Sequence, residues 1–154
     1  MNPATKSIVI VEDELSYAEA LVALLTRHLD CPVHLFLDPL DAVAGLPGLN
    51  PGVIVTDYHM PHLNGVEFIR EAAPRVPETV FLMMSGQNVA AFEPGLATLA
   101  PLRGLLSKPF SWRKLAEEIQ RVWPAGSQAP ALRLEKEQGP KKKEETAERD
   151  RADR

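Results

Sequence analysis

The chain has 154 residues, about the length of one domain, and its 45% hydrophobic and 25% charged residues are typical of a globular protein with a proper core. Its formal net charge is −4, with acidic and basic residues interspersed, so the composition indicates no nucleic-acid-binding surface. A single cysteine, Cys31, excludes an internal disulfide, and only four consecutive apolar residues precede the first acids, so we expect a cytoplasmic protein with no signal peptide and no membrane span.

The first half of the chain alternates apolar runs with helical patterns. The run "SIVIV" at 7–11 predicts a buried strand. Residues 16–29 predict a helix, because their apolar side chains recur every three or four residues and so form one stripe. A second strand is predicted at 33–37. A short helix is predicted at 39–46, where a proline stands near the first turn, a position that tolerates it.

The second half repeats this alternation three times. The predicted elements are strands at 52–56, 79–84 and 104–107, and helices at 65–73, within 89–99 (the weakest pattern) and at 111–123. Pro74 ends the helix at 65–73, and Ser111 is a suitable N-cap for the helix at 111–123. Strands that are apolar throughout and separated by helices indicate a parallel sheet covered on both faces. We therefore predict an α/β fold of five βα units around a doubly wound, five-stranded parallel sheet.

Composition divides the chain after residue 123. Residues 124–154 open with Pro, Gly, Ser and Ala, and then become almost wholly charged, with only two leucines. Such a segment cannot bury enough apolar surface to offset the entropy lost on ordering. We predict a domain at 1–123 and a charged, flexible tail at 124–154, transiently helical near 132–138. Its lysines at 141–143 could dock on an acidic partner, although a solvated, inert tail is the simpler interpretation.

Polar side chains follow four of the five predicted strands. Glu12 and Asp13 follow the first strand, Asp57 the third, Ser85 the fourth and Lys108 the fifth. Any one of them alone would usually be a helix cap, a loop residue or a surface residue. In an open parallel sheet, however, ligands bind beyond the carboxyl ends of the strands. We therefore expect these five side chains to meet at one edge of the sheet.

The charges of this group predict its chemistry. Three clustered carboxylates repel one another unless a cation compensates them, and oxygen-only ligands suit a hard ion such as Mg²⁺. A metal and a lysine together could neutralise the oxygens of a phosphoryl group in transfer. A carboxylate can itself attack phosphorus and form an aspartyl phosphate. Asp57 is the natural nucleophile because it follows the central strand, and Ser85 could donate a hydrogen bond to a phosphoryl oxygen.

The motifs "VEDE", "TDYHMPHLNG", "MMSG" and "SKPF" occur in this order, and over residues 6–123 the sequence resembles the response regulator receiver domain of two-component signal transduction, in its single-domain, CheY-like form. The resemblance implies the flavodoxin-like receiver fold, with Asp57 as the phosphoacceptor. It implies that Mg²⁺ (or Mn²⁺) is held by Asp13 and Asp57, by Glu12 mainly through a bound water, and by the backbone carbonyl of His59.

The same resemblance assigns further roles. It implies that Ser85 takes the place of the switch Ser/Thr, that Lys108 pairs with the phosphate, and that the Lys108–Pro109 peptide is cis. Gly65, in the loop that Met60, Pro61 and Asn64 also shape, is expected to adopt a backbone conformation costly for other residues.

The resemblance also implies the partners. They are expected to be a sensor histidine kinase or the histidine phosphotransfer protein of a phosphorelay, and a downstream protein target, with no direct nucleic-acid binding and no membrane. We expect the protein to catalyse only its own phosphorylation and dephosphorylation, and so not to be an enzyme in the ordinary sense.

Other interpretations are less well supported. His59 and His62 straddle a proline with no cysteine nearby, which argues against zinc. A phosphatase with an aspartate nucleophile usually has a second acid two residues on, where this chain has His59. An interaction module that is not phosphorylated usually lacks the acceptor, an acidic residue or the lysine, and all are present here. We expect a stand-alone receiver; a receiver fragment of a hybrid kinase or multidomain regulator, or a phosphate sink, remains open.

One position distinguishes this chain from many receivers. A Tyr or Phe often stands three residues before the lysine, and this chain has Leu105 there. Either the loop and helix after the fourth strand couple Ser85 to the surface, or Leu105 is simply core packing.

His59 and Gln87 stand two residues beyond Asp57 and Ser85, with the small Gly86 leaving access to the phosphate. We expect their side chains to tune the access of water to the phosphate.

Overall fold

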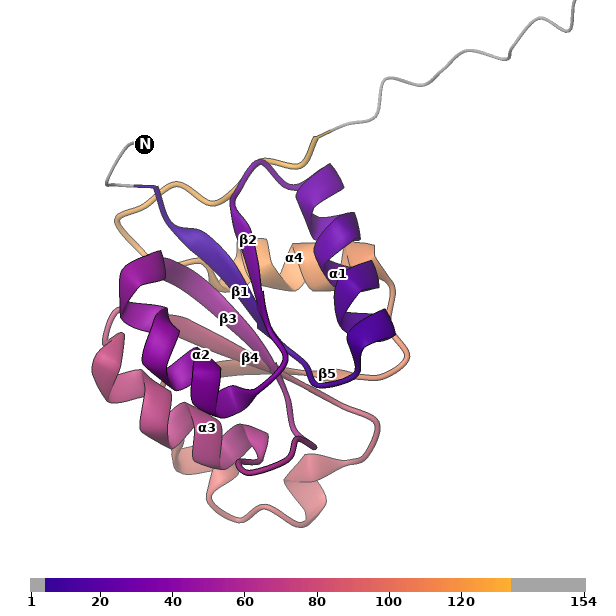
Figure 1. Ribbon diagram of the computed structural model, residues 1–154, viewed down its shortest axis with the longest axis vertical. Helices are drawn as coiled ribbons and strands as arrows, with labels where there is room; N and C mark the ends of the chain where they lie inside the picture. Colours follow the sequence, from indigo (N-terminus) through magenta and orange to yellow (C-terminus); the bar gives the residue numbers. More distant parts are fainter. Residues whose placement is uncertain (1–4, 134–154) are drawn as a thin grey trace, which may run out of the picture.

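The computed structural model describes residues 5–133 and contains a parallel sheet of five strands in the order β2-β1-β3-β4-β5 (Figure 1). The order reverses between β1 and β3, where ligand crevices form in doubly wound sheets. The strands are β1 (Ser7–Val11), β2 (Val33–Phe36), β3 (Pro51–Asp57), β4 (Val80–Ser85) and β5 (Leu102–Ser107). The predicted parallel sheet is confirmed.

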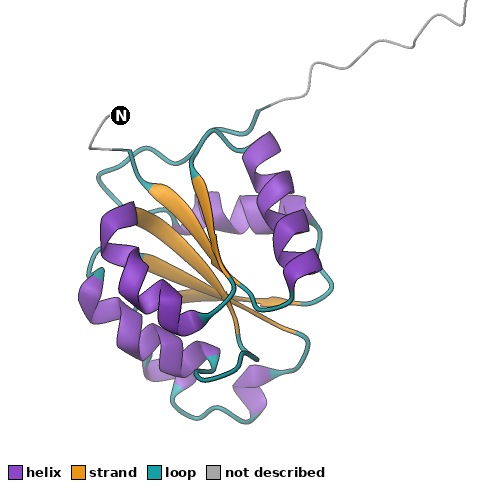
Figure 2. Ribbon diagram, viewed as in Figure 1, coloured by secondary structure: helices purple, strands orange, loops and turns teal. Residues whose placement is uncertain are grey.

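Helices cover both faces of the sheet (Figure 2). The α-helices are α1 (Leu15–His28), α2 (Pro39–Gly45), α3 (Gly65–Ala72) and α4 (Trp112–Val122), and short 3-10 helices lie at η1 (Leu46–Leu49), η2 (Ala73–Arg75), η3 (Val89–Ala91) and η4 (Leu96–Thr98). Side chains alternate along each strand, so one strand feeds two cores. In β1, Ile8 and Ile10 pack with α1 and α4, whereas Val9 and Val11 pack with α2 and α3.

The helix predicted within 89–99 is wrong. In the described part of the chain the connection from β4 to β5 holds only the two 3-10 turns η3 and η4. Pro94 interrupts this segment, and a proline inside a helix removes a backbone donor and clashes with the preceding turn. Gly95 follows it, and glycine weakens a helix further. Three α-helices therefore join the strands, none lies between β4 and β5, and α4 follows β5.

The boundary predicted at residue 123 is also wrong, because residues 124–133 pack on the domain. Leu132 forms an antiparallel bridge with Leu29 and joins the core between α1 and α4. The N–H of Asp30 donates to the carbonyl of Ala131 at 3.0 Å, and Gln120 donates to the carbonyl of Pro130 at 3.0 Å. The remaining tail predictions, including most of 132–138 and all of 141–143, lie outside the described residues.

Over residues 5–133, no helix is both long enough and apolar enough to cross a bilayer.

Candidate functional site

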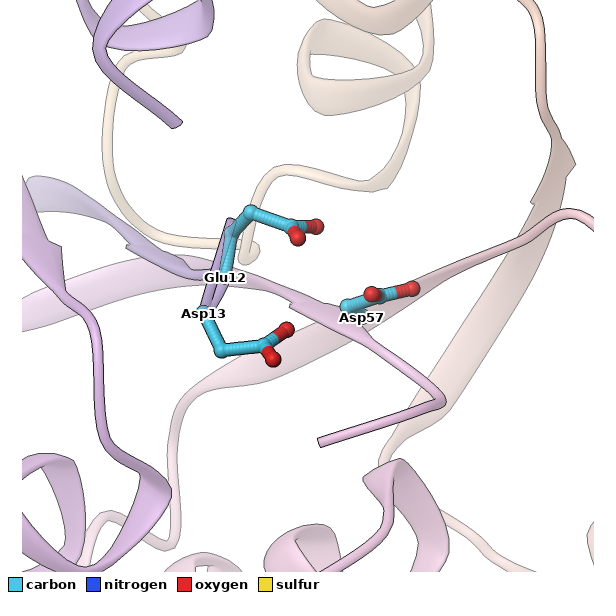
Figure 3. Close-up of side chains that lie close together, drawn as sticks. All are labelled: Glu12, Asp13 and Asp57. Atoms are coloured by element: carbon cyan, nitrogen blue, oxygen red, sulfur yellow. The ribbon is translucent and has the colours of Figure 1, made fainter. Parts of the chain in front are cut away.

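The carboxyl ends of β1 and β3 bring three acids together. Glu12 and Asp13 directly follow β1, and Asp57 is the last residue of β3, which pairs with β1 in parallel. One ligand oxygen from each residue lies within 4.8 Å of the other two. Figure 3 shows Glu12 and Asp13 extending from successive positions of the chain toward the side on which Asp57 lies. Glu12 and Asp57 are buried, at 1% and 7% exposed, whereas Asp13 is exposed.

Lys108 completes the charged group. Its Nζ lies 3.1 Å from Oε2 of Glu12 and 3.4 Å from Oδ1 of Asp57. The residue follows β5, and the Lys108–Pro109 peptide is cis, as expected. Burial lowers the pKa of this ammonium, but the hydrogen bond to Glu12 and the charge of Asp57 outweigh the burial and raise the pKa overall. The lysine therefore keeps its positive charge beside the acceptor candidate.

The acids fit a divalent cation. Burial, followed by the charge of Asp57, raises the pKa of Glu12 to about 7, even though the Lys108 hydrogen bond acts in the opposite direction. One lysine therefore does not compensate two buried carboxylates. The nearby exposed Asp13 adds a third anionic donor, and all the donor atoms are oxygens. This donor set suits Mg²⁺ or Mn²⁺, which bind carboxylate oxygens and retain water at the remaining positions.

Ser85 ends β4 one residue beyond the position that pairs with Asp57. It is 6% exposed, and its hydroxyl oxygen accepts a hydrogen bond from the N–H of Gln87 at 3.0 Å. Its carbonyl accepts from the N–H of Lys108 at 2.8 Å, which ties the fourth and fifth strand ends together. The hydroxyl thus stands in the row of strand ends that carries the acids and the lysine.

The loop after Asp57 is held by backbone contacts. The N–H of Tyr58 donates to Oδ1 of Asp57 at 2.9 Å, and the N–H of Gly65 donates to the carbonyl of Tyr58 at 2.8 Å. Gly65 is required for space, because a Cβ there would lie 2.8 Å from the carbonyl oxygen of Asp57. The expected special backbone conformation is instead found at His62, whose φ is 72°. Asn64 caps α3 in a reciprocal box with Glu67.

The two histidines of this loop have separate neighbours. Nε2 of His59 lies 3.2 Å from Oε1 of Gln87, so the two residues predicted to flank the phosphate contact each other. Nε2 of His62 lies 4.0 Å from Oδ2 of Asp38. Within residues 5–133 the acidic trio is the one cluster of metal-ligating side chains, and neither histidine belongs to it. The role of the His59 backbone carbonyl stays a prediction.

Sequence reasoning missed two tyrosines. The ring of Tyr17, in the first turn of α1, lies 4.4 Å from Nζ of Lys108. The buried Tyr58 donates a short hydrogen bond from its hydroxyl to Glu93, in the connection between β4 and β5, and this bond raises the pKa of Tyr58 to about 12. The position of Tyr58 directly after Asp57 could have marked it as a residue of the site. For Tyr17, the only such indication in the sequence was its short distance along the chain from Glu12 and Asp13.

Leu105 is not core packing. Its side chain is 46% exposed and borders two cavities beside the connection from β4 to β5, of about 400 Å³ and about 190 Å³. Ser85 also lines the smaller cavity, so Ser85 and Leu105 border the same open space.

Comparison with known proteins identifies the family of the chain. Residues 8–120 match the family model of the response regulator receiver domain. The transcriptional regulatory protein FlgR of Helicobacter pylori is 29% identical over 115 residues, which cover 75% of this chain and 29% of FlgR. The chain thus spans less than a third of that relative's length.

Solved structures share the fold. The chemotaxis protein CheY4 of Vibrio cholerae is 24% identical with a TM-score of 0.68, and the match covers 77% of this chain and 99% of that protein. The response regulator domain of Thermotoga maritima CheB is 25% identical with a TM-score of 0.66, covering 77% of this chain and 96% of the domain.

Proposed function

Because this chain belongs to the response regulator receiver family of two-component systems, we propose that it accepts a phosphoryl group on Asp57 from a phosphohistidine of a partner protein. The observation that carries the proposal is the position of Asp57. It is buried at the end of a central strand, 3.4 Å from the Lys108 ammonium and within 4.8 Å of the two other acids. The donor would be a sensor histidine kinase or a histidine phosphotransfer protein.

The proposed transfer is a displacement at phosphorus. A carboxylate oxygen of Asp57 forms a bond to phosphorus while the P–N bond of the donor breaks, and the electron pair of that bond returns to the imidazole nitrogen. Lys108 neutralises charge on the phosphoryl oxygens, and Ser85 donates its hydroxyl hydrogen to one of them. Water attack on the aspartyl phosphate later returns inorganic phosphate and the free carboxylate. In this proposal the protein catalyses only its own phosphorylation and dephosphorylation.

Glu12, Asp13 and Asp57 would hold Mg²⁺ or Mn²⁺, and we propose that the carbonyl of His59 adds a further oxygen. The ion would supply positive charge against the phosphoryl oxygens, which the single lysine cannot fully compensate. The residues of the chain do the rest: Glu12 holds Lys108 beside the acceptor, and the backbone N–H of Tyr58 orients one acceptor oxygen.

The proposed output is a change of protein partner. A phosphoryl group adds charge at the site and so biases a surface with two states around β4 and the segment that follows it. Action within a longer regulator is a second candidate, favoured by the match to only 29% of FlgR. A phosphate sink would need no partner surface at all.

Phosphoramidate tests the donor chemistry, because its phosphorus is bonded to nitrogen as in phosphohistidine. With Mg²⁺ present, ³¹P spectra should show an acyl phosphate resonance that disappears with EDTA and in Asp57→Asn. A resonance that persists in Asp57→Asn would contradict the assignment. Affinity capture with beryllofluoride-treated and untreated protein then tests the output, since a downstream target should bind one state and a phosphate sink should capture nothing selectively.

A further inference from the structure

The aromatic ring of Tyr17 lies against the lysine of the site and has no part in the proposed transfer. Nζ of Lys108 is 4.4 Å from the centroid of this ring, while its other contacts are the carboxylates of Glu12 and Asp57. Tyr17 is half-buried, and the Lys108 side chain is 25% exposed. A cation at this distance over a ring is attracted by the negative face of the ring.

The start of α1 holds Tyr17 through contacts that involve neither Lys108 nor Asp57. The Glu14 carboxylate caps the helix, accepting hydrogen bonds from the N–H of Ser16 at 3.3 Å and of Tyr17 at 2.6 Å. Tyr17 also packs against the core between α1 and α4. The helix cap therefore holds the backbone of Tyr17 and apolar packing holds its ring, and neither contact changes charge when Asp57 is modified.

We propose that Tyr17 is a positioning residue for phosphoryl transfer, whose ring keeps the Lys108 ammonium beside Asp57; this inference rests on the proposed function. A lysine side chain has many rotamers, and holding it in one costs entropy. Glu12 alone would hold the ammonium by charge, but it is also a metal ligand candidate. A neutral ring attracts the ammonium without binding the metal or repelling the phosphoryl group, and it stays in place when a phosphoryl oxygen replaces Oδ1 of Asp57 as the partner of Lys108.

Two substitutions separate the ring from the hydroxyl. Tyr17→Phe keeps the ring and should retain the wild-type rate of labelling by acetyl phosphate. Tyr17→Leu removes it and should lower the rate about fivefold to tenfold, as expected for a half-buried ammonium that loses a ring partner. In proton spectra, the ε-methylene signals of Lys108 should be shifted upfield by the ring in wild type and Tyr17→Phe, and return to ordinary positions in Tyr17→Leu.

A double-mutant cycle with Lys108→Met decides whether Tyr17 acts through the lysine. Tyr17→Leu should slow labelling in the Lys108 chain and have no further effect in the Lys108→Met chain. An equal loss of labelling rate on Tyr17→Leu in both chains would overturn the inference. Lys108 ε-methylene signals that are not shifted upfield in wild type would also overturn it, and this result can be read even where labelling is too slow to measure. A wild type that is not labelled at all would instead count against the proposed function. A labelled wild type with an equally fast Tyr17→Leu would count against Tyr17 alone.

Discussion

At the scale of single residues, the site is short of positive charge. Glu12 is almost fully buried and shares one ammonium with Asp57, and its pKa is raised to about 7 by burial and by the Asp57 charge. A site built only for structural stability would pair each buried acid. The uncompensated charge is instead what a site for a divalent cation and a phosphoryl group requires.

This charge predicts a dependence of stability on pH. The folded-state pKa of Glu12, about 7, lies above its ordinary value of 4.5, so the folded protein holds the proton more tightly than the unfolded chain. Its contribution to stability is complete below pH 4.5 and is lost as the pH rises through about 7. In the metal-free protein, the unfolding free energy measured with urea should therefore fall between pH 5 and 8 more steeply than in Glu12→Gln. Equal slopes in the two proteins would refute the assignment.

A second residue-scale prediction concerns the lifetime of the phosphate. His59 and Gln87 contact each other at 3.2 Å and are both exposed, so they can limit water access without binding metal. His59→Ala and Gln87→Ala should each change the dephosphorylation rate severalfold and leave Mg²⁺ affinity nearly unchanged. His62→Ala is the matched control, because His62 faces Asp38 instead. A large loss of Mg²⁺ affinity in His59→Ala would restore the histidine side chain as a metal ligand.

At the scale of elements, the connection from β4 to β5 is the feature that departs most from the predicted fold. It has 3-10 turns where a helix was predicted, and Tyr58 ties it to the acceptor loop through Glu93. Phe92 adds an edge-to-face contact with the Tyr58 ring at 5.6 Å. Asp57 and this segment are therefore joined by one residue, whose backbone contacts the acceptor and whose hydroxyl contacts the segment.

This link predicts how a signal spreads. On binding beryllofluoride, the wild-type protein should show backbone amide shifts concentrated in residues 86–99, with smaller changes around Leu105. Tyr58→Phe removes only the hydroxyl, so it should bind beryllofluoride equally well but show reduced shifts at Glu93 and its neighbours. Shifts confined to the ligand shell in wild type would exclude this route and favour a phosphate sink or relay.

The helix wrongly predicted within 89–99 shows why local sequence alone does not determine every element. The segment 89–99 contains apolar residues at spacings that suit a helix, but Pro94 and Gly95 oppose one. The hydrogen bond that the Tyr58 hydroxyl donates to Glu93 cannot be inferred from either segment alone. The central strands β1, β3 and β4 were predictable because their apolar runs are buried on both faces of the sheet. The acids, Ser85 and Lys108 were predictable because each stands at the carboxyl end of a strand or within two residues of it. Tyr17 was not, because its contact with Lys108 depends on how α1 turns.

At the scale of the whole molecule, residues 124–133 extend the domain. The average composition of residues 124–154 is too polar for a core. This average concealed the apolar residues that stand before the charged run and pack on the domain. Pro130 is buried and Leu132 is half-buried against the core between α1 and α4. The N–H of Arg133 donates to the carbonyl of His28, whose ring stacks on Trp112 at 3.8 Å. This segment therefore reinforces the packing of α1 on α4.

Removing these contacts should destabilise the protein. Leu132→Ala should lower the unfolding free energy by about 1–2 kcal/mol, less than for a fully buried leucine because Leu132 is half-buried. Arg133→Ala is the matched control, since it removes only an exposed ion pair with Asp30 and should have little effect. Urea denaturation measures both. A Leu132→Ala protein as stable as wild type would show that the segment does not contribute to the domain.

The central claim is that Asp57 alone carries the phosphoryl group and requires a divalent metal. The most direct test is intact-protein and peptide mass spectrometry after treatment with acetyl phosphate. The wild-type protein should gain a single phosphoryl adduct on Asp57 with Mg²⁺ and none with EDTA, and Asp57→Ala should gain none. Full labelling of Asp57→Ala, or equal labelling of the wild type with EDTA, would contradict the account.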